Sequence, residues 1–447
     1  MTPNRPQVAP AEAWSFPLPD FYRLPNDLAV WQYQLPGQRL ASAKLIFDLP
    51  LSAEDRAVEG ITYLMARTLD EGTRVRSAEE FAEETELLGA CYSARVSYSG
   101  FRTGVEVPVG RIAPALELLA EAASLPAFPS DEVSRAVRNR CDDIVDELAR
   151  PGRRAKLEIA AAMFAATCRL SRPDSGSAQT VAGIGRDELS RWYDTQVDPG
   201  RATLVLAGDF AGLDMPATVA GAFAGWRGGT VPADSPIEPV SRQGRRVRVV
   251  HRPGAVQTHL EFGVPATDRT DARWAGMRVA SHALGGTITS RLDVVLREEK
   301  GYTYGIRAGL RPYRRGSAFA ITGSVHTAVT GDAVALALEL VAGVRTGGIT
   351  ENERSRAVDY LLGVTPLRYQ TATAVAERAA DLVHGGLGPG HVAVQRAALA
   401  TVTDEGAGSA LAPCLDPERL SLVAVGDADV IADQLRACYG DVEVVDA

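Results

Sequence analysis

The chain has 447 residues, of which 46% are hydrophobic and 23% charged, and its formal net charge is −9. This is the composition of a soluble globular protein, and the length allows two or more domains. The acidic balance argues against nucleic-acid binding, because affinity for phosphate groups requires a basic face.

The first 24 residues are rich in Pro, Ala and polar side chains, and we expect residues 1–24 to be a flexible N-terminal segment. Neither this segment nor any later stretch contains an apolar run long enough for a signal peptide or a membrane span. The odd number of cysteines, without metal-binding or redox spacing, suggests reduced thiols; they are Cys91, Cys141, Cys168, Cys414 and Cys438. We therefore expect a cytoplasmic protein that does not contact a membrane.

Three pairs of similar segments recur along the chain in the same order, at offsets of 212, 221 and 218 residues. The pairs are residues 89–95 with 301–307, 134–137 with 355–358, and 199–209 with 417–427. One such pair could arise by chance. Three pairs at nearly one offset indicate a duplicated unit of about 200 residues.

Each copy of the unit mixes strands and helices. Alternating apolar and polar residues predict strands at 43–49 and 258–264. Capping residues and apolar periodicity predict helices at 131–148 and 272–284, the second ending at Gly285-Gly286. We therefore expect an α+β protein made of two duplicated domains, each a mostly antiparallel sheet with helices on one face.

The domain boundary is predicted where apolar periodicity stops. Residues 228–245 are rich in Gly, Pro, Ser and charge, which is typical of a linker. The first domain would then span residues 25–227 and the second residues 246–447.

Motif-like segments at 60–73, 252–257 and 285–306 suggest a family. With this layout the chain resembles the pitrilysin/insulinase-type metallopeptidases, the inverzincins, over residues 48–429. It is most similar to their small subunits of about 450 residues, which work as dimers. In catalytic members, a first-domain helix carries His-x-x-Glu-His, whose imidazoles bind zinc and whose Glu is the general base.

The corresponding segment here lacks these residues. Alignment on Gly60 and on Gly72-Thr73 places Tyr63, Ala66 and Arg67 at the first His, the Glu and the second His, and Asp143 near the third-ligand position. No shift of the alignment restores the motif, because all six histidines follow residue 250: His251, His259, His282, His326, His384 and His391. We expect no metal site and no cofactor bound by this chain.

The second half carries a different signal. Residues 292–300 predict a helix that Gly301 ends, followed by a strand at 302–308, so that Arg297 and Tyr304 could project to one side of this corner. The resemblance implies that this Arg and Tyr reach into the active site, where the Tyr hydroxyl donates to the oxyanion.

The resemblance extends to the residues before this corner, and it implies substrate binding by Gly285, Gly286 and Thr287. Tyr92, the first-half counterpart of Tyr304, has Thr85 where the Arg would be, which favours different roles for the two halves.

These observations predict the non-zinc subunit of a heterodimeric zinc metalloendopeptidase. Its partner would be a homologous subunit that bears His-x-x-Glu-His and holds the zinc, and its substrate would be a peptide bound extended against a strand edge. One alternative is a non-proteolytic scaffold or peptide-binding homologue that resembles the core subunits of respiratory complexes. Another is a homodimeric enzyme of different chemistry, although the sequence has no Gly-x-Ser-x-Gly elbow, phosphate loop or Cys/His dyad.

Overall fold

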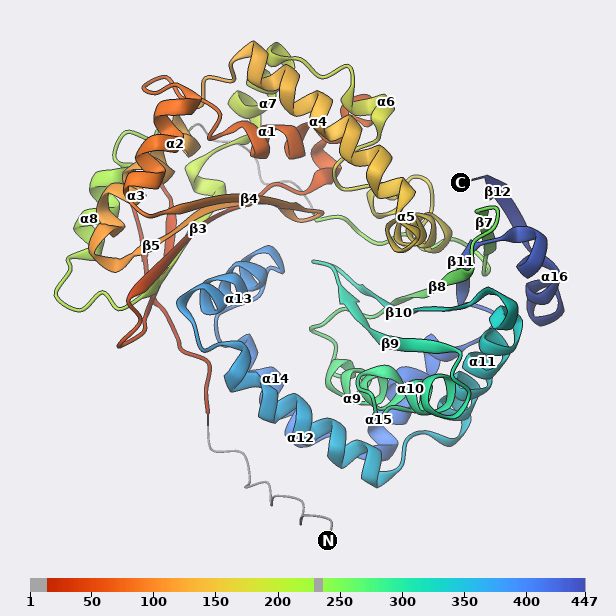
Figure 1. Ribbon diagram of the computed structural model, residues 1–447. Helices are drawn as coiled ribbons and strands as arrows, with labels where there is room; N and C mark the ends of the chain where they lie inside the picture. Colours follow the sequence, from red (N-terminus) through yellow and green to blue (C-terminus); the bar gives the residue numbers. More distant parts are fainter. Residues whose placement is uncertain (1–13, 229–235, 447) are drawn as a thin grey trace, which may run out of the picture.

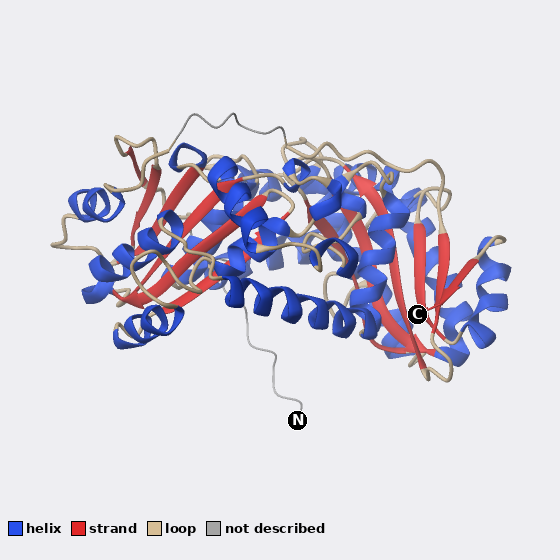
Figure 2. Cartoon of the chain, turned by 90° about the horizontal axis from the view of Figure 1, so that it is seen from above, coloured by secondary structure: helices blue, strands red, loops and turns tan. Residues whose placement is uncertain are grey.

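The structure is a computed structural model that describes residues 14–228 and 236–446. It consists of two lobes, each built on a six-stranded sheet (Figure 1). The two sheets lie towards opposite ends of an elongated molecule, with helices packed around them (Figure 2).

The two sheets have the same strand order over five positions. The first runs β1-β2-β6-β3-β5-β4 and the second β12-β7-β11-β8-β10-β9. The strands of the first sheet are β1 (Asp20–Arg23), β2 (Ala29–Gln34), β3 (Leu40–Asp48), β4 (Cys91–Ser97), β5 (Gly100–Pro108) and β6 (Ala202–Gly208). Those of the second are β7 (Val247–His251), β8 (Gln257–Ala266), β9 (Thr303–Pro312), β10 (Ser317–His326), β11 (Ser421–Gly426) and β12 (Glu443–Asp446).

The helices follow the same duplication. The first half has α1 (Ile61–Thr68), α2 (Ala78–Leu87), α3 (Ile112–Ser124), α4 (Ser130–Ala149), α5 (Pro151–Met163), α6 (Ala178–Val181), α7 (Arg186–Gln196) and α8 (Met215–Phe223). The second half has α9 (Trp274–Gly285), α10 (Arg291–Asp293), α11 (Thr330–Gly347), α12 (Glu351–Arg368), α13 (Ala372–His384), α14 (His391–Ala400), α15 (Asp404–Leu411) and α16 (Ala428–Tyr439). A π-helical turn, Val294–Glu299, continues α10.

The strand pairings confirm the predicted α+β fold with two duplicated domains. The repeated segments 199–209 and 417–427 contain β6 and β11, each of which runs parallel to one neighbour and antiparallel to the other. The repeats at 89–95 and 301–307 contain the edge strands β4 and β9. Both sheets are mixed, because β2–β6, β7–β11 and β7–β12 are parallel pairs. This is a small departure from the expected mostly antiparallel sheets.

Helices cover both faces of each sheet, where one face was expected. The second covering layer comes from the other half of the chain: α13 packs on the side of the first sheet that faces the second lobe, and α5 packs correspondingly on the second sheet (Figure 1). Strand β3 shows the result, since every residue from Ala41 to Phe47 is buried.

Small side chains allow these exchanged helices to approach closely. Ala376 and Ala379 of α13 are fully buried in one cluster with Ile46 of β3. On the other sheet, a Cβ at Gly263 would lie 2.7 Å from side-chain atoms of Ile159 and Met163 in α5. Glycine at this position therefore lets α5 rest directly on β8.

Charge also fixes α13. Lys44 of β3 is buried, and its Nζ lies 3.1 Å from Glu106 and 3.5 Å from Glu377 of α13. Arg102 of β5 pairs with Glu377 and with Asp381 of the same helix. A buried cation is stable only when it is paired in this way, so these contacts restrict how α13 lies on the sheet.

The predicted N-terminal segment and linker lie partly outside the described residues, at 1–13 and 229–235. The described part of the N-terminal segment is packed, because Trp14 and Phe16 contact the ring of Tyr369 at centroid distances of 6.0 and 5.1 Å. In the linker, the carbonyl of Val240 accepts a hydrogen bond from the amide of Ala165.

One segment of the described chain, Thr327–Gly347, is long and apolar enough to cross a membrane, with 39% of its most apolar window buried. From the sequence we expected no stretch long enough to span a membrane, but this helix is long enough. One side of this segment belongs to the core of the second lobe, where Ala333, Val334, Ala337 and Val341 are buried. Core helices of globular domains pass the same test, so this helix is weak evidence for a membrane, and the cytoplasmic location stays a prediction.

The exchanged packing of α13 leads to a testable expectation. Leu382 is fully buried between this helix and the first sheet, so Leu382→Ala should lower the free energy of unfolding by about 2–4 kcal/mol through lost burial and a cavity. Leu367→Ala, at a 64% exposed position of α12, should cost about 0.5 kcal/mol or less. Urea denaturation of both variants tests this, and equal losses would contradict the packing.

Candidate functional site

Helix α1 occupies the place of the motif helix. Tyr63 is half-buried, Ala66 is fully buried, and Arg67 is exposed. The helix is held by its other apolar residues, since Ile61, Leu64 and Met65 belong to the core of the first lobe. The three motif positions therefore carry a phenol, a methyl group and a guanidinium.

The neighbouring helix α4 presents a cation to α1. Arg140 is 3% exposed, and its guanidinium lies 5.1 Å from the centre of the Tyr63 ring. It donates to both carboxylate oxygens of Glu147 at 3.2 and 3.0 Å, and to the carbonyl of Ser175. Asp143, predicted near the third-ligand position, is exposed. The carboxylate that this cation engages near α1 is therefore that of Glu147.

These residues do not fit a zinc ion. None of the three motif positions offers an imidazole or a carboxylate, and Arg cannot lose its charge to become a ligand. The carboxylate of Glu147 is already neutralised by the buried cation of Arg140. Sequence inspection overlooked this pair, although Arg140 and Glu147 are seven residues apart, which is two helical turns.

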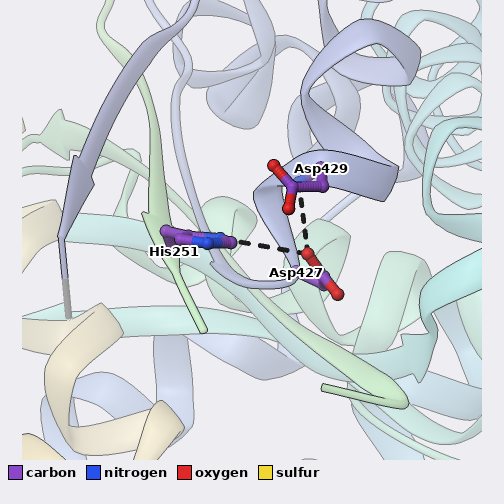
Figure 3. A group of neighbouring side chains, drawn as sticks. All are labelled: His251, Asp427 and Asp429. Carbon is purple, nitrogen blue, oxygen red and sulfur yellow. Dashed lines mark hydrogen bonds and ion pairs between the residues drawn. The ribbon is translucent and has the colours of Figure 1, made fainter. Parts of the chain in front are cut away.

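A second group of possible ligands lies in the other lobe. His251 at the end of β7 lies near Asp427 and Asp429 at the start of α16 (Figure 3). The Nδ1 of His251 accepts a hydrogen bond from the amide of Ala428 at 3.0 Å, and Asp427 accepts from the amides of Gly254 and Asp429. These contacts satisfy the first amides of α16, and we assign the group to helix capping.

Tyr304 lies at the start of the edge strand β9. Between the Thr303–Val325 and Ile306–Gly323 pairs, β9 advances three residues while β10 advances two, which is a β-bulge. The hydroxyl of Thr303 holds the bulge by donating to the carbonyl of Ser324 at 2.6 Å and accepting from the amide of Gly305. Bulges redirect side chains, and Tyr304 is 96% exposed.

Tyr92, which the sequence repeat matches to Tyr304, has a different place in its own sheet. Tyr92 lies on β4, which pairs with β5 in unbroken register. Its hydroxyl is buried, and its ring contacts Phe81 edge-on at 5.9 Å. Because the repeat aligns Leu206 of β6 with Ala424 of β11, the pairings across each sheet place Tyr92 in the position of Ile306. The match of Tyr92 with Tyr304 is therefore wrong by two residues.

Arg297 lies in the π-helical turn that precedes β9, where a regular helix was expected. Its Nη1 lies 3.4 Å from the carboxylate of Asp293, which is fully buried. The same carboxylate accepts from Arg307 at 2.6 Å and from the amide of Ile306. Asp293 thus ties the turn that carries Arg297 to β9, the strand that carries Tyr304, and sequence reasoning did not identify it.

The glycines before this corner have a packing role. A Cβ at Gly285 would lie 2.5 Å from the amide nitrogen of Ala308 in β9, and one at Gly286 would meet the ring of His282. Glycine therefore allows the end of α9 to touch the edge strand. Thr287 shares a hydrogen bond with Thr289 on the surface. Substrate contact by Gly285, Gly286 and Thr287 stays a prediction.

The structure has two similar lobes, without histidine or carboxylate at the three motif positions of α1 and with Tyr304 exposed on β9. This arrangement is the one expected of a metallopeptidase-like protein without zinc ligands at the motif positions. Two family profiles match consecutive parts of the chain: insulinase (peptidase family M16) over residues 32–169, and the peptidase M16 inactive domain over residues 183–361. The chain belongs to the M16 family of peptidases, which confirms the resemblance inferred from its motifs.

The chain has relatives in sequence and solved structures of similar fold. An uncharacterized zinc protease of Streptomyces coelicolor is 27% identical over 376 residues, covering 79% of this chain and 78% of the relative. The fold is similar to that of a peptidase M16 inactive domain from Pseudomonas fluorescens, with a TM-score of 0.83, 21% identity and coverage of 92% and 98%. A protease from Helicobacter pylori has a TM-score of 0.82 at 15% identity, with coverage of 92% and 100%.

The Arg140–Glu147 pair leads to a second expectation. Glu147→Gln should destabilise the first lobe by about 2 kcal/mol or more, because it leaves the buried cation of Arg140 without its counter-charge. Asp143→Asn, at an exposed position of the same helix, should change stability by about 0.5 kcal/mol or less. Thermal and urea denaturation distinguish the two carboxylates, and a larger effect at Asp143 would contradict the geometry.

A third expectation concerns pH. Burial raises the pKa of Asp70, just after α1, from 3.8 to about 6; Glu71 also raises it, while a backbone hydrogen bond, Arg67 and Arg135 lower it. The folded state therefore binds the proton more tightly than the unfolded state. Protonated Asp70 therefore adds to the free energy of unfolding below about pH 4, and this contribution is lost as the pH rises to about 6.

Asp70→Asn should remove this dependence and raise the free energy of unfolding at pH 8 by about 1–3 kcal/mol relative to the parent chain. Denaturation curves at pH 5 and pH 8 measure the effect. A variant that is less stable than the parent at pH 8 would show that the charged carboxylate is stabilising.

Proposed function

We propose that this chain is the non-zinc subunit of a heterodimeric zinc metalloendopeptidase. The observation that carries the proposal is Tyr304, whose hydroxyl is exposed on a bulged edge strand and makes no hydrogen bond to any described residue. A phenol held in this way is available to a substrate. The absence of zinc ligands at Tyr63, Ala66 and Arg67 requires the metal to come from a homologous partner subunit with His-x-x-Glu-His.

The chemistry of the corner supports this role. A phenol is a neutral donor at pH 7, and a guanidinium is a permanent cation with several donors. The hydroxyl of Tyr304 would donate a hydrogen bond to the carbonyl oxygen of the scissile peptide bond as charge develops on it. Arg297, partly exposed and held by Asp293, would orient the peptide or the Tyr. Zinc in the partner would supply the activated water.

The free edge of β9 suits an extended substrate. In the described chain β9 pairs only with β10, so the backbone groups along its other side have no strand partner. An extended peptide can bind such an edge through main-chain hydrogen bonds. The peptide would then pass the hydroxyl of Tyr304 at the start of the strand.

A partner that bears the zinc motif, mixed with this chain, makes the proposal testable. Cleavage of a quenched fluorescent peptide should require both chains, and Tyr304→Phe should lower kcat of the pair about 100-fold or more, the usual cost of one lost oxyanion donor. Tyr360→Phe removes an exposed hydroxyl from α12 and serves as the matched control, with activity unchanged.

An unchanged kcat/KM in the Tyr304→Phe pair would show that the hydroxyl has no catalytic role. If no partner makes the pair active while peptide still binds to this chain, the chain is a peptide-binding or scaffold homologue instead.

A further inference from the structure

A cavity of about 430 Å³ at the edge of β9 has walls of one charge. It lies among α9, α12, α13 and α14, and its lining contains no Asp or Glu. It is lined by five arginines, which are Arg269, Arg278, Arg368, Arg378 and Arg396. The chain as a whole is acidic, with a net charge of −9, so a cavity lined by five arginines differs from the average charge of the chain.

Most of these guanidiniums lack an acidic partner. Within the described chain, the side chains of Arg269, Arg278, Arg368 and Arg378 form neither a hydrogen bond nor an ion pair, and the Nε atoms of Arg269 and Arg378 are buried and unsatisfied. Many other arginines of the chain pair with Asp or Glu, as Arg291 does with Glu353 at 2.6 Å.

The nearest carboxylates are committed elsewhere. Asp268 accepts from the amides of Thr270 and Gly316, and Asp381 pairs with Arg102. The cations of the cavity therefore repel one another, and the charges of Asp381 and Asp268 offset this repulsion at Arg269 only in part. Burial, together with Arg378 and Arg368, lowers the pKa of Arg278 to about 10. Leaving like charges unpaired in a partly buried site costs free energy, which a bound anion would recover.

The basic surface continues beyond this cavity. A neighbouring cavity of about 490 Å³ lies where β4, the β9–β10 turn and α13 meet, and it shares Arg269, Arg378 and Pro312 with the first. It adds Arg95, Arg102 and Arg314, of which Arg102 pairs with Glu377 and Asp381, and Arg314 with Asp48. The two cavities adjoin through Arg269 and Arg378, so the basic surface extends beyond the first cavity at the junction of the lobes.

The first cavity also borders the strand that carries Tyr304. Ala308, Gly309 and Leu310 of β9 line it, as does Gly286. Gly309 is five residues after Tyr304, and an extended strand rises about 3.3 Å per residue, so the two positions are ~17 Å apart along the strand. A peptide lying on the free edge of β9 would span this distance with about five residues.

We infer that this cavity, termed the arginine cavity, binds acidic side chains of a peptide that lies along β9, about five residues from the position next to Tyr304. Guanidinium forks match carboxylates in bidentate pairs, so these side chains suit acidic groups of a peptide. The extended basic surface and the adjoining strand edge favour a peptide over a small polyanion. The inference deepens the proposed function by naming its substrate class, and it rests on that function.

Binding to this chain alone tests the inference without any cleavage. Three fluorescent 12-residue peptides that differ only in having three Glu, three Gln or three Lys at the same positions are titrated by anisotropy. The Glu peptide should bind at least about tenfold more tightly than the Gln peptide, and its affinity should fall as NaCl is raised. The Lys peptide should bind least.

The double variant Arg278→Gln/Arg378→Gln should reduce binding of the Glu peptide to the level of the Gln peptide. It should fold as the parent does, since these side chains have no partners to lose, and circular dichroism checks this. Arg345→Gln/Arg436→Gln changes two exposed arginines of outer helices and should leave binding unchanged.

Equal affinity for the Glu and Gln peptides, or undiminished binding of the Glu peptide to the arginine-cavity variant, would overturn the inference. If inorganic pyrophosphate binds the parent and not the variant while the Glu peptide binds neither, the cavity takes a compact anion and the inference is again overturned. Because neither zinc nor a partner enters these measurements, their failure is distinct from failure of the peptidase pair.

Discussion

The structure depends on the exchange of two helices between its halves. Each sheet is apolar on both faces, and the face towards the other lobe is covered by a helix that the other half contributes, α13 on the first sheet and α5 on the second. The hydrophobic effect thereby joins the lobes, since uncovering either face would expose a large apolar surface to water. The corner with Arg297 and Tyr304, the basic cavities at the lobe junction and the motif helix are consequently held at fixed places relative to one another.

Much of the fold could be predicted because local sequence patterns determine the helices and strands. Strand alternation, helix caps and the repeated segments gave the α+β class and the duplication, and these became equivalent strands in equivalent places. The exchange could not be predicted in this way. The residues that α13 buries, such as Ala376 and Ala379, make the helix amphipathic, but an apolar stripe does not specify which of two similar sheets it covers.

The candidate site likewise has features that the sequence predicts and features that only the structure reveals. The absence of histidine ligands in the first half follows from a count of histidines, which no structure is needed to make. The roles of Asp293 and of the Arg140–Glu147 pair could be recognised only in the structure. The sequence does not indicate whether a single Asp or Arg on a helix is buried. The arginine cavity could not be predicted from the sequence either. Its five arginines are spread over 128 positions, from Arg269 to Arg396, and come together only through tertiary packing.

The bulge in β9 decides which way Tyr304 faces. If β9 continued in register from the Ile306–Gly323 pair, Tyr304 would lie opposite Val325 of β10, whose side chain is buried. Side chains on a strand point alternately to the two faces of the sheet. One extra residue in β9, without a matching residue in β10, therefore reverses the direction of the side chain at the bulge. The bulge thus presents at the surface a phenol that an unbroken register would direct to the core side of the sheet, while Ile306 and Val325 keep their places in that core.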